Sequence, residues 1–108
     1  MLLAGAALLA GCGSSGPTDK QLIATIIKRE GTHPITLCAS LTNSVLATIG
    51  GRSACLRQAA SSAPDPTTHA ASIEVRGTSA TAVEVDQAGS HTISFVKRGG
   101  VWKVSGVS

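Results

Sequence analysis

The sequence predicts an α+β domain in which N-terminal helices pack on one face of a curved antiparallel sheet of about four strands. Three observations carry this prediction. Up to about residue 60, apolar residues recur every three or four positions, which is typical of helices. From about residue 70, apolar and polar residues alternate, which is typical of half-buried strands. Between them, residues 61–68 contain two prolines and cannot continue a helix.

The first predicted helix begins after Thr18. The Thr18 hydroxyl can cap the helix, and Gln21, three residues later, completes a capping box. Asp19 lies in the first turn, where a negative charge stabilises the helix dipole. The apolar residues of this helix are Leu22, Ile23, Ile26 and Ile27. We expect the helix to stop at Gly31.

Two further helices are expected before the proline-containing linker. Pro34 can open the second helix, and Gly50-Gly51 can end it. The apolar stripe of this second helix consists of Cys38, Leu41, Val45 and Ile49. The third helix is expected from Ser53 to Ala60, with Cys55, Leu56 and Ala59 on one side.

Four strands follow, over residues 71–76, 81–86, 92–97 and 101–107. Short turns make each strand the neighbour of the next one. In the first two strands, Glu74 and Glu84 alternate with the apolar positions, so we expect both carboxylates to face water. In the third strand, Ile93 and Phe95 should share one face. In the fourth strand, Trp102 and Val104 should share one face. Arg98-Gly99-Gly100 has the composition of a hairpin turn.

The first residues have the pattern of a lipoprotein leader. An apolar run ends in Leu9-Ala10-Gly11-Cys12, the bacterial lipobox pattern. The run is shorter than the roughly 20 residues that span a bilayer and suits a signal peptide. We expect residues 1–11 to be a signal peptide with a missing or truncated basic start, Cys12 to carry lipid, and residues 12–17 to be a flexible spacer. The alternative is a buried N-terminal helix followed by a Gly/Ser linker.

The cysteine count agrees with export. If Cys12 is acylated, Cys38 and Cys55 remain as a pair in an oxidising compartment, where disulfides persist. Closing this short loop stabilises the domain by about 3 kcal/mol. The alternative is two buried free thiols in adjacent helices. A zinc site is disfavoured because the pair lacks Cys-x-x-Cys spacing.

Composition excludes several classes of function. The net charge of +3 is scattered along the chain, so we expect no nucleic-acid surface. Phe95 and Trp102 are the only aromatic residues, which disfavours a large, tight ligand pocket. Trp102 and Phe95 remain candidates to border a ligand cavity, although core packing is the simpler interpretation of Trp102. No Gly-x-Ser-x-Gly elbow is present, and no catalytic residue or cofactor is predicted.

Other candidate sites have simpler explanations. His33, His69 and His91 show no metal-ligand spacing, so we expect solvated loop histidines and no metal. The segment Gly50-Gly51-Arg52-Ser53 could cradle an anion but reads more simply as a joint between helices. A basic hairpin tip, formed by Lys97, Arg98 and Lys103, could touch anionic headgroups or wall polymer, but solvated turn charges are the simpler explanation.

The helical segment 35–42, the later helical Cys55 and the closing hairpin 93–104 together resemble the NTF2-like (cystatin-like) superfamily, in particular small exported lipoproteins of actinobacterial type. The resemblance covers roughly residues 18–108, and it implies a curved sheet wrapped around helices with a cone-shaped cavity. Isomerase members of that family use a carboxylate base with a Tyr, and this chain has no Tyr. Asp65 lies in the linker and Asp86 ends a strand.

Taken together, the sequence predicts a lipoprotein anchored at the outer face of the cell membrane. Its domain is expected to be non-enzymatic and to bind a protein partner or a small apolar ligand. The alternative is a small NTF2-like isomerase or lyase that acts on an apolar metabolite. A buried carboxylate or histidine with a displaced pKa inside a cavity would favour the enzyme.

Overall fold

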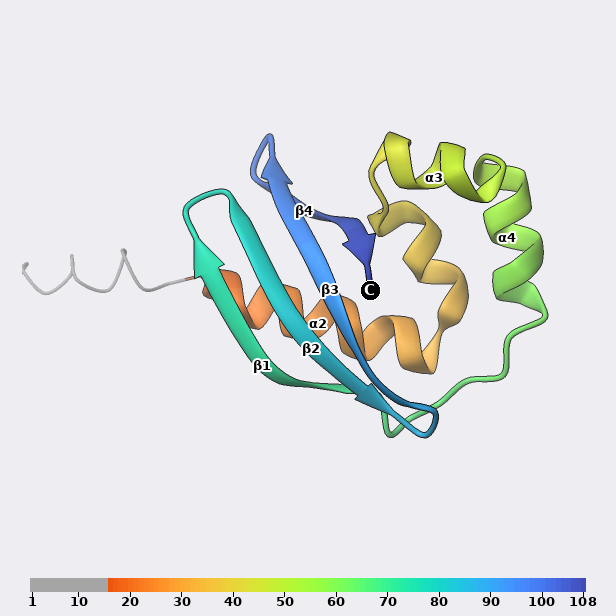
Figure 1. The fold of residues 1–108 in the computed structure, drawn as a ribbon, viewed down its shortest axis with the longest axis horizontal. Coiled ribbons are helices and arrows are strands. Elements are labelled where there is room, and N and C mark those ends of the chain that lie inside the picture. The colour runs from red at the N-terminus through yellow and green to blue at the C-terminus, as the bar shows by residue number, and fades with distance from the viewer. Residues whose placement is uncertain (1–15) are drawn as a thin grey trace, which may run out of the picture.

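A computed structural model describes residues 16–108 (Figure 1). The expected signal peptide and Cys12 therefore lie outside the described residues. The helical elements are α2 (Asp19–Thr32), the 3-10 helix η1 (Pro34–Ser40), α3 (Asn43–Ile49) and α4 (Arg52–Ala60). The strands are β1 (His69–Arg76), β2 (Ser79–Asp86), β3 (Gly89–Arg98) and β4 (Val101–Val107). Within residues 16–108, no helix combines the length and apolarity needed to cross a membrane.

The predicted fold class is confirmed: helices come first and pack against a four-stranded antiparallel sheet. The strands follow one another in the order β1-β2-β3-β4, as the short turns require. Figure 1 shows α2 crossing one face of the sheet, while α3 and α4 lie beyond the β4 side. Irregularities between Ala70 and Ser72, and between Ser94 and Phe95, interrupt the register and bend the strands.

Helix α2 begins as predicted. The Thr18 side chain accepts a hydrogen bond from the Gln21 N–H at 3.1 Å, and the Gln21 side chain accepts one from the Thr18 N–H at 2.8 Å. The predicted stop at Gly31 is wrong, because the helix continues to Thr32. Gly31 is needed for another reason: a Cβ atom there would lie 2.6 Å from Thr68 Oγ1 and 2.8 Å from the Asp65 carbonyl oxygen. The linker can therefore pack directly on the helix backbone.

The single helix predicted from Pro34 to Gly50 is also wrong, because the chain breaks it into η1 and α3. At the break, Leu41 is extended and forms a bridge to Val104 of β4. The Thr42 N–H donates to the Val104 carbonyl at 3.0 Å, and the Thr42 side chain then caps α3. Pairing with the sheet edge therefore overrides the helical periodicity of this segment. The joint Gly50-Gly51 links α3 to α4 with positive φ at both residues.

The expected inner face of β2 is wrong, because the residues that face the helices are shifted by one position along the strand. Ala80, Ala82 and Glu84 face the helices and are buried, whereas Val83 is on the opposite face. The two-residue turn Gly77-Thr78 causes this, because it pairs Val75 directly with Ala80. Glu74 is exposed as expected, but Glu84 is only 6 % exposed.

The core lies between the sheet and the helices. It contains Ile23 and Ile27 of α2 together with the predicted inner faces of β3 and β4. The members of those faces are Ile93, Phe95, Trp102 and Val104. At the far end of the same face, the apolar residues give way to Glu84 and to its cross-strand partner His91. The polar end of the sheet is where the candidate site lies.

Candidate functional site

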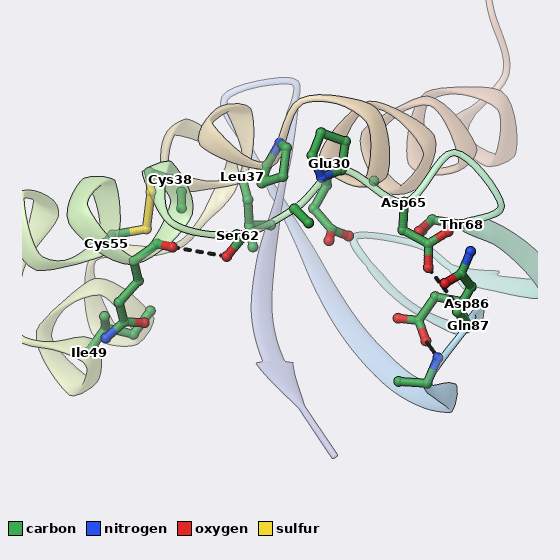
Figure 2. A pocket seen from close by; sticks show the side chains of 17 residues that line it. Glu30, Leu37, Cys38, Ile49, Cys55, Ser62, Asp65, Thr68, Asp86 and Gln87 are labelled. Atoms are coloured by element: carbon green, nitrogen blue, oxygen red, sulfur yellow. Dashed lines mark hydrogen bonds between the residues drawn. A yellow bond between two sulfur atoms is a disulfide. The ribbon is translucent and has the colours of Figure 1, made fainter.

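A pocket of about 450 Å³ opens where the end of α2, η1, α4, the linker and the β2–β3 turn meet (Figure 2). We call it the Glu30 pocket. One wall is apolar and contains Leu37, Ile49 and the disulfide. The opposite wall carries Asp65 and Asp86, and Figure 2 shows Glu30 between the two walls. The pocket therefore combines an apolar side with a concentration of carboxylates.

The apolar wall is fixed by the expected disulfide. Cys38 of η1 and Cys55 of α4 are joined with an S–S distance of 2.04 Å and a Cα–Cα distance of 5.9 Å. Both cysteines are buried, and both line the pocket. The bridge closes a sequence separation of 17 residues. The disulfide holds η1 against α4, so the width of the pocket depends on it.

Asp65 fixes the acidic wall. Its carboxylate accepts hydrogen bonds from the N–H groups of Thr67 and Gln87, both at 2.9 Å. Its own N–H donates to the Gly31 carbonyl oxygen at 2.7 Å. The hydrogen bonds from Thr67 and Gln87 lower the pKa of Asp65, so it stays ionised at neutral pH. Through its carboxylate and its N–H group, Asp65 thus joins the linker, the β2–β3 turn and α2.

Glu30 is the perturbed acid of the pocket. Burial raises its pKa to about 8, and a hydrogen bond with Glu84 and the negative charges of Glu84 and Asp86 contribute further. At neutral pH, Glu30 is therefore predominantly protonated beside the buried Glu84 side chain. Glu84 Oε2 has no hydrogen-bond partner among the described residues. A buried, unpartnered carboxylate oxygen is costly and calls for an explanation.

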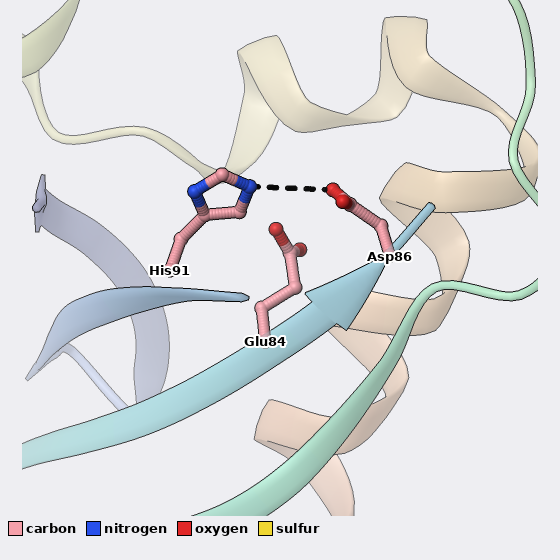
Figure 3. A group of neighbouring side chains, drawn as sticks. All are labelled: Glu84, Asp86 and His91. Atoms are coloured by element: carbon pink, nitrogen blue, oxygen red, sulfur yellow. Dashed lines mark ion pairs between the residues drawn. The ribbon is translucent and has the colours of Figure 1, made fainter. Parts of the chain in front are cut away.

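Glu84, Asp86 and His91 form a cluster (Figure 3), and two of its members, Glu84 and Asp86, act on the pKa of Glu30. One ligand atom from each residue lies within 4.8 Å of the others. Asp86 Oδ1 accepts the Ala88 N–H at 2.8 Å, which leaves Oδ2 facing His91 Nε2 at 3.5 Å. In Figure 3, the Glu84 carboxylate points toward the space between His91 and Asp86. We call this group the Glu84 cluster.

The aromatic candidates do not border the Glu30 pocket. Phe95 and Trp102 are 1 % and 3 % exposed and pack in the core, so burial explains both. Trp102 Nε1 donates to Asp19 at 3.0 Å, and Lys97 Nζ also donates to Asp19 at 3.0 Å. The predicted basic tip is therefore divided, because Lys97 pairs with Asp19 and Lys103 Nζ donates to a backbone carbonyl of η1.

The three histidines do not come together. His33 and His69 are exposed, and of the three only His91 lies in the Glu84 cluster. Sequence reasoning missed Glu30, Glu84 and Asp86 as members of one site. A usable signal was present: the tight turn Gly77-Thr78 fixes which residues of β2 face the helices.

No family model, no curated protein and no solved structure matches this chain.

Proposed function

We propose that this chain is a lipoprotein, held at the outer face of a cell membrane through Cys12, whose domain binds a small ligand in the Glu30 pocket. The disulfide supports export, because such bonds persist in oxidising compartments. The apolar run before Cys12 supports the anchor. The observation that carries the binding proposal is the pocket of about 450 Å³ with an apolar wall, an acidic wall and Glu30 between them.

The proposal includes an NTF2-like relationship for residues 18–108. Helices followed by an antiparallel meander, with two irregularities that bend the sheet, support this relationship. In that family, a cavity lies between a curved sheet and its helices. We take the Glu30 pocket, which is lined by the helices, the linker and the β2–β3 turn, as the counterpart of that cavity in this chain.

A substitution that fills the pocket tests the binding proposal. Ala63 lines the pocket from the linker and is exposed, so Ala63→Trp should fill space without disturbing the core. Ala60, also exposed but outside the pocket lining, provides the matched control Ala60→Trp. Native mass spectrometry of protein extracted in mild detergent should show a non-covalently retained molecule in the parent and the control, but not in Ala63→Trp. Equal retention by all three proteins, or by none, would refute binding in this pocket.

One observation favours a second candidate, an isomerase or lyase that acts on an apolar metabolite. Glu30 has a pKa of about 8 beside an apolar wall, a value suited to proton transfer near neutral pH. Glu84 would then hold Glu30 by the hydrogen bond between their carboxyl groups. A β,γ-unsaturated ketone is a suitable probe, because its isomerisation requires proton transfer at carbon. Turnover that Glu30→Gln abolishes would select the enzyme, and no turnover above the uncatalysed rate would exclude it for this reaction class.

A further inference from the structure

The Glu84 cluster contains a buried side-chain oxygen that residues 16–108 leave without a hydrogen-bond partner. Glu84 is 6 % exposed, and its Oε2 lacks a hydrogen-bond partner among residues 16–108. Buried carboxylate oxygens are normally paired, hydrogen-bonded or bound to a metal. Figure 3 shows this carboxylate pointing toward the space between His91 and Asp86, so a ligand of Oε2 would lie among the three side chains.

The separation of His91 Nε2 from Asp86 Oδ2 also matches that of two ligands bound to one metal ion. His91 Nε2 and Asp86 Oδ2 lie 3.5 Å apart, beyond the usual 2.7–3.2 Å of a hydrogen bond. Two ligands that each lie about 2.0–2.2 Å from a tetrahedral zinc ion are separated by roughly 3.4 Å. The imidazole and the Asp86 carboxylate thus already have the separation of two zinc ligands. The Glu84 oxygen needs only a small side-chain movement to join them, because all three ligand atoms lie within 4.8 Å of one another.

The backbone holds the three side chains in place. Glu84 and His91 are directly opposite each other on β2 and β3. Asp86 ends β2, where its Oδ1 is occupied by the Ala88 N–H and its Oδ2 remains available. The ligand types also select the metal, since an imidazole with two carboxylates suits Zn²⁺ better than Mg²⁺ or Ca²⁺, which prefer oxygen ligands.

We propose that Glu84, Asp86 and His91 bind one divalent transition-metal ion, Zn²⁺ being the best fit, at the acidic side of the Glu30 pocket. Three protein ligands leave a fourth position open. Asp86 also lines the pocket, so this open position can accept a ligand donor atom from a molecule bound there. The inference deepens the proposed binding function and depends on it for the role of the pocket.

Isothermal titration of Zn²⁺ into the full chain carrying Cys12→Ser tests the site, because this substitution removes the thiol as a competing ligand. We expect one ion per chain and at least 100-fold weaker binding of Mg²⁺. His91→Gln, Glu84→Gln and Asp86→Asn should each weaken Zn²⁺ binding by about 100-fold or more. His69→Gln and Glu74→Gln change exposed residues of the same types and should bind like the parent.

Two further readouts keep the test decisive. Glu84→Gln replaces a buried carboxyl group with an amide of similar size, so it should fold even if His91→Gln does not. In proton NMR spectra, Zn²⁺ should shift the imidazole signals of His91 and leave those of His33 and His69 unchanged. Unchanged affinity in Glu84→Gln, shifts at other histidines, or no binding of Zn²⁺ would overturn the site.

The outcomes separate this inference from the proposed function. If Zn²⁺ does not bind but Ala63→Trp still removes a retained molecule, the metal site is refuted and the binding pocket is supported. If Zn²⁺ binds as expected but the pocket retains no molecule and the chain is not found on membranes, the proposed function is refuted and the metal site is supported.

Discussion

Replacing Glu30 by glutamine should change how the stability of the domain depends on pH. The ordinary pKa of 4.5 applies to Glu30 in the unfolded chain, whereas the folded protein raises it to about 8. Between these values, the folded state holds a proton that the unfolded state has released. The free energy of unfolding should therefore fall as pH rises from about 4.5 to about 8, and Glu30 should contribute no pH dependence outside this window. In Glu30→Gln this contribution is absent.

The size of the effect follows from the shift and from solvent exposure. The full shift corresponds to about 5 kcal/mol at 1.36 kcal/mol per pKa unit. Because Glu30 is only partly buried and opens to the pocket, solvent screening reduces the expected effect to about 2 kcal/mol. Asp19 and Asp65 have lowered pKa values, which affect stability only below about pH 4. Measurements from about pH 5 upward therefore isolate the contribution of Glu30 from theirs.

Urea unfolding at about pH 5, 7 and 9, followed through Trp102 fluorescence, measures this difference. A Cys12→Ser background prevents thiol–disulfide exchange, and EDTA removes bound metal. The parent should lose about 2 kcal/mol more than Glu30→Gln between the extremes. Glu74→Gln alters an exposed glutamate and should follow the parent. Identical pH profiles for the parent and Glu30→Gln would refute the raised pKa and, with it, the protonated Glu30–Glu84 pair.

Three further substitutions test individual contacts. Cys38→Ser should lower the free energy of unfolding by about 3 kcal/mol, and equal melting temperatures for oxidised and reduced parent protein would contradict this. Gly31→Ala should lower the urea midpoint by an amount equivalent to about 1–3 kcal/mol, because its Cβ atom would clash with the linker. Gly106 has open space around it, so Gly106→Ala should change the midpoint little. Equal midpoints for the two variants would show that the linker does not pack closely on Gly31. Asp19→Asn should lower the melting temperature and shift Trp102 emission by removing the negative charge at the indole N–H, and an unchanged spectrum would argue against that bond.

The fold class was predictable because local signals agreed with tertiary structure over most of the chain. The capping box at Thr18, the proline-containing linker and the Gly99-Gly100 turn all lie where expected. The break between η1 and α3 was not predictable from periodicity, because a pairing with β4, distant in sequence, extends Leu41. The final strands were correct on both faces, since their apolar residues are large and unambiguous.

The site was only partly predictable. The Cys38–Cys55 disulfide followed from counting cysteines. The Glu84 cluster did not, because the valines of β2 suggested the wrong inner face and thereby placed Glu84 in water. Small residues at Ala80 and Ala82 instead face the helices, opposite the large Phe95 and Ile93. The pairing register of β1 with β2, which the Gly77-Thr78 turn sets, therefore determines which side chains of β2 face the helices.

Mass spectrometry of the protein extracted from native membranes distinguishes a lipid-anchored, oxidised protein from a cytosolic one. We expect a mature chain that begins at Cys12 with acyl chains attached, and a Cys38–Cys55 bridge that lowers the mass by two hydrogens. An unlipidated chain that retains residues 1–11, carries three free thiols and is recovered from the cytosol would contradict it.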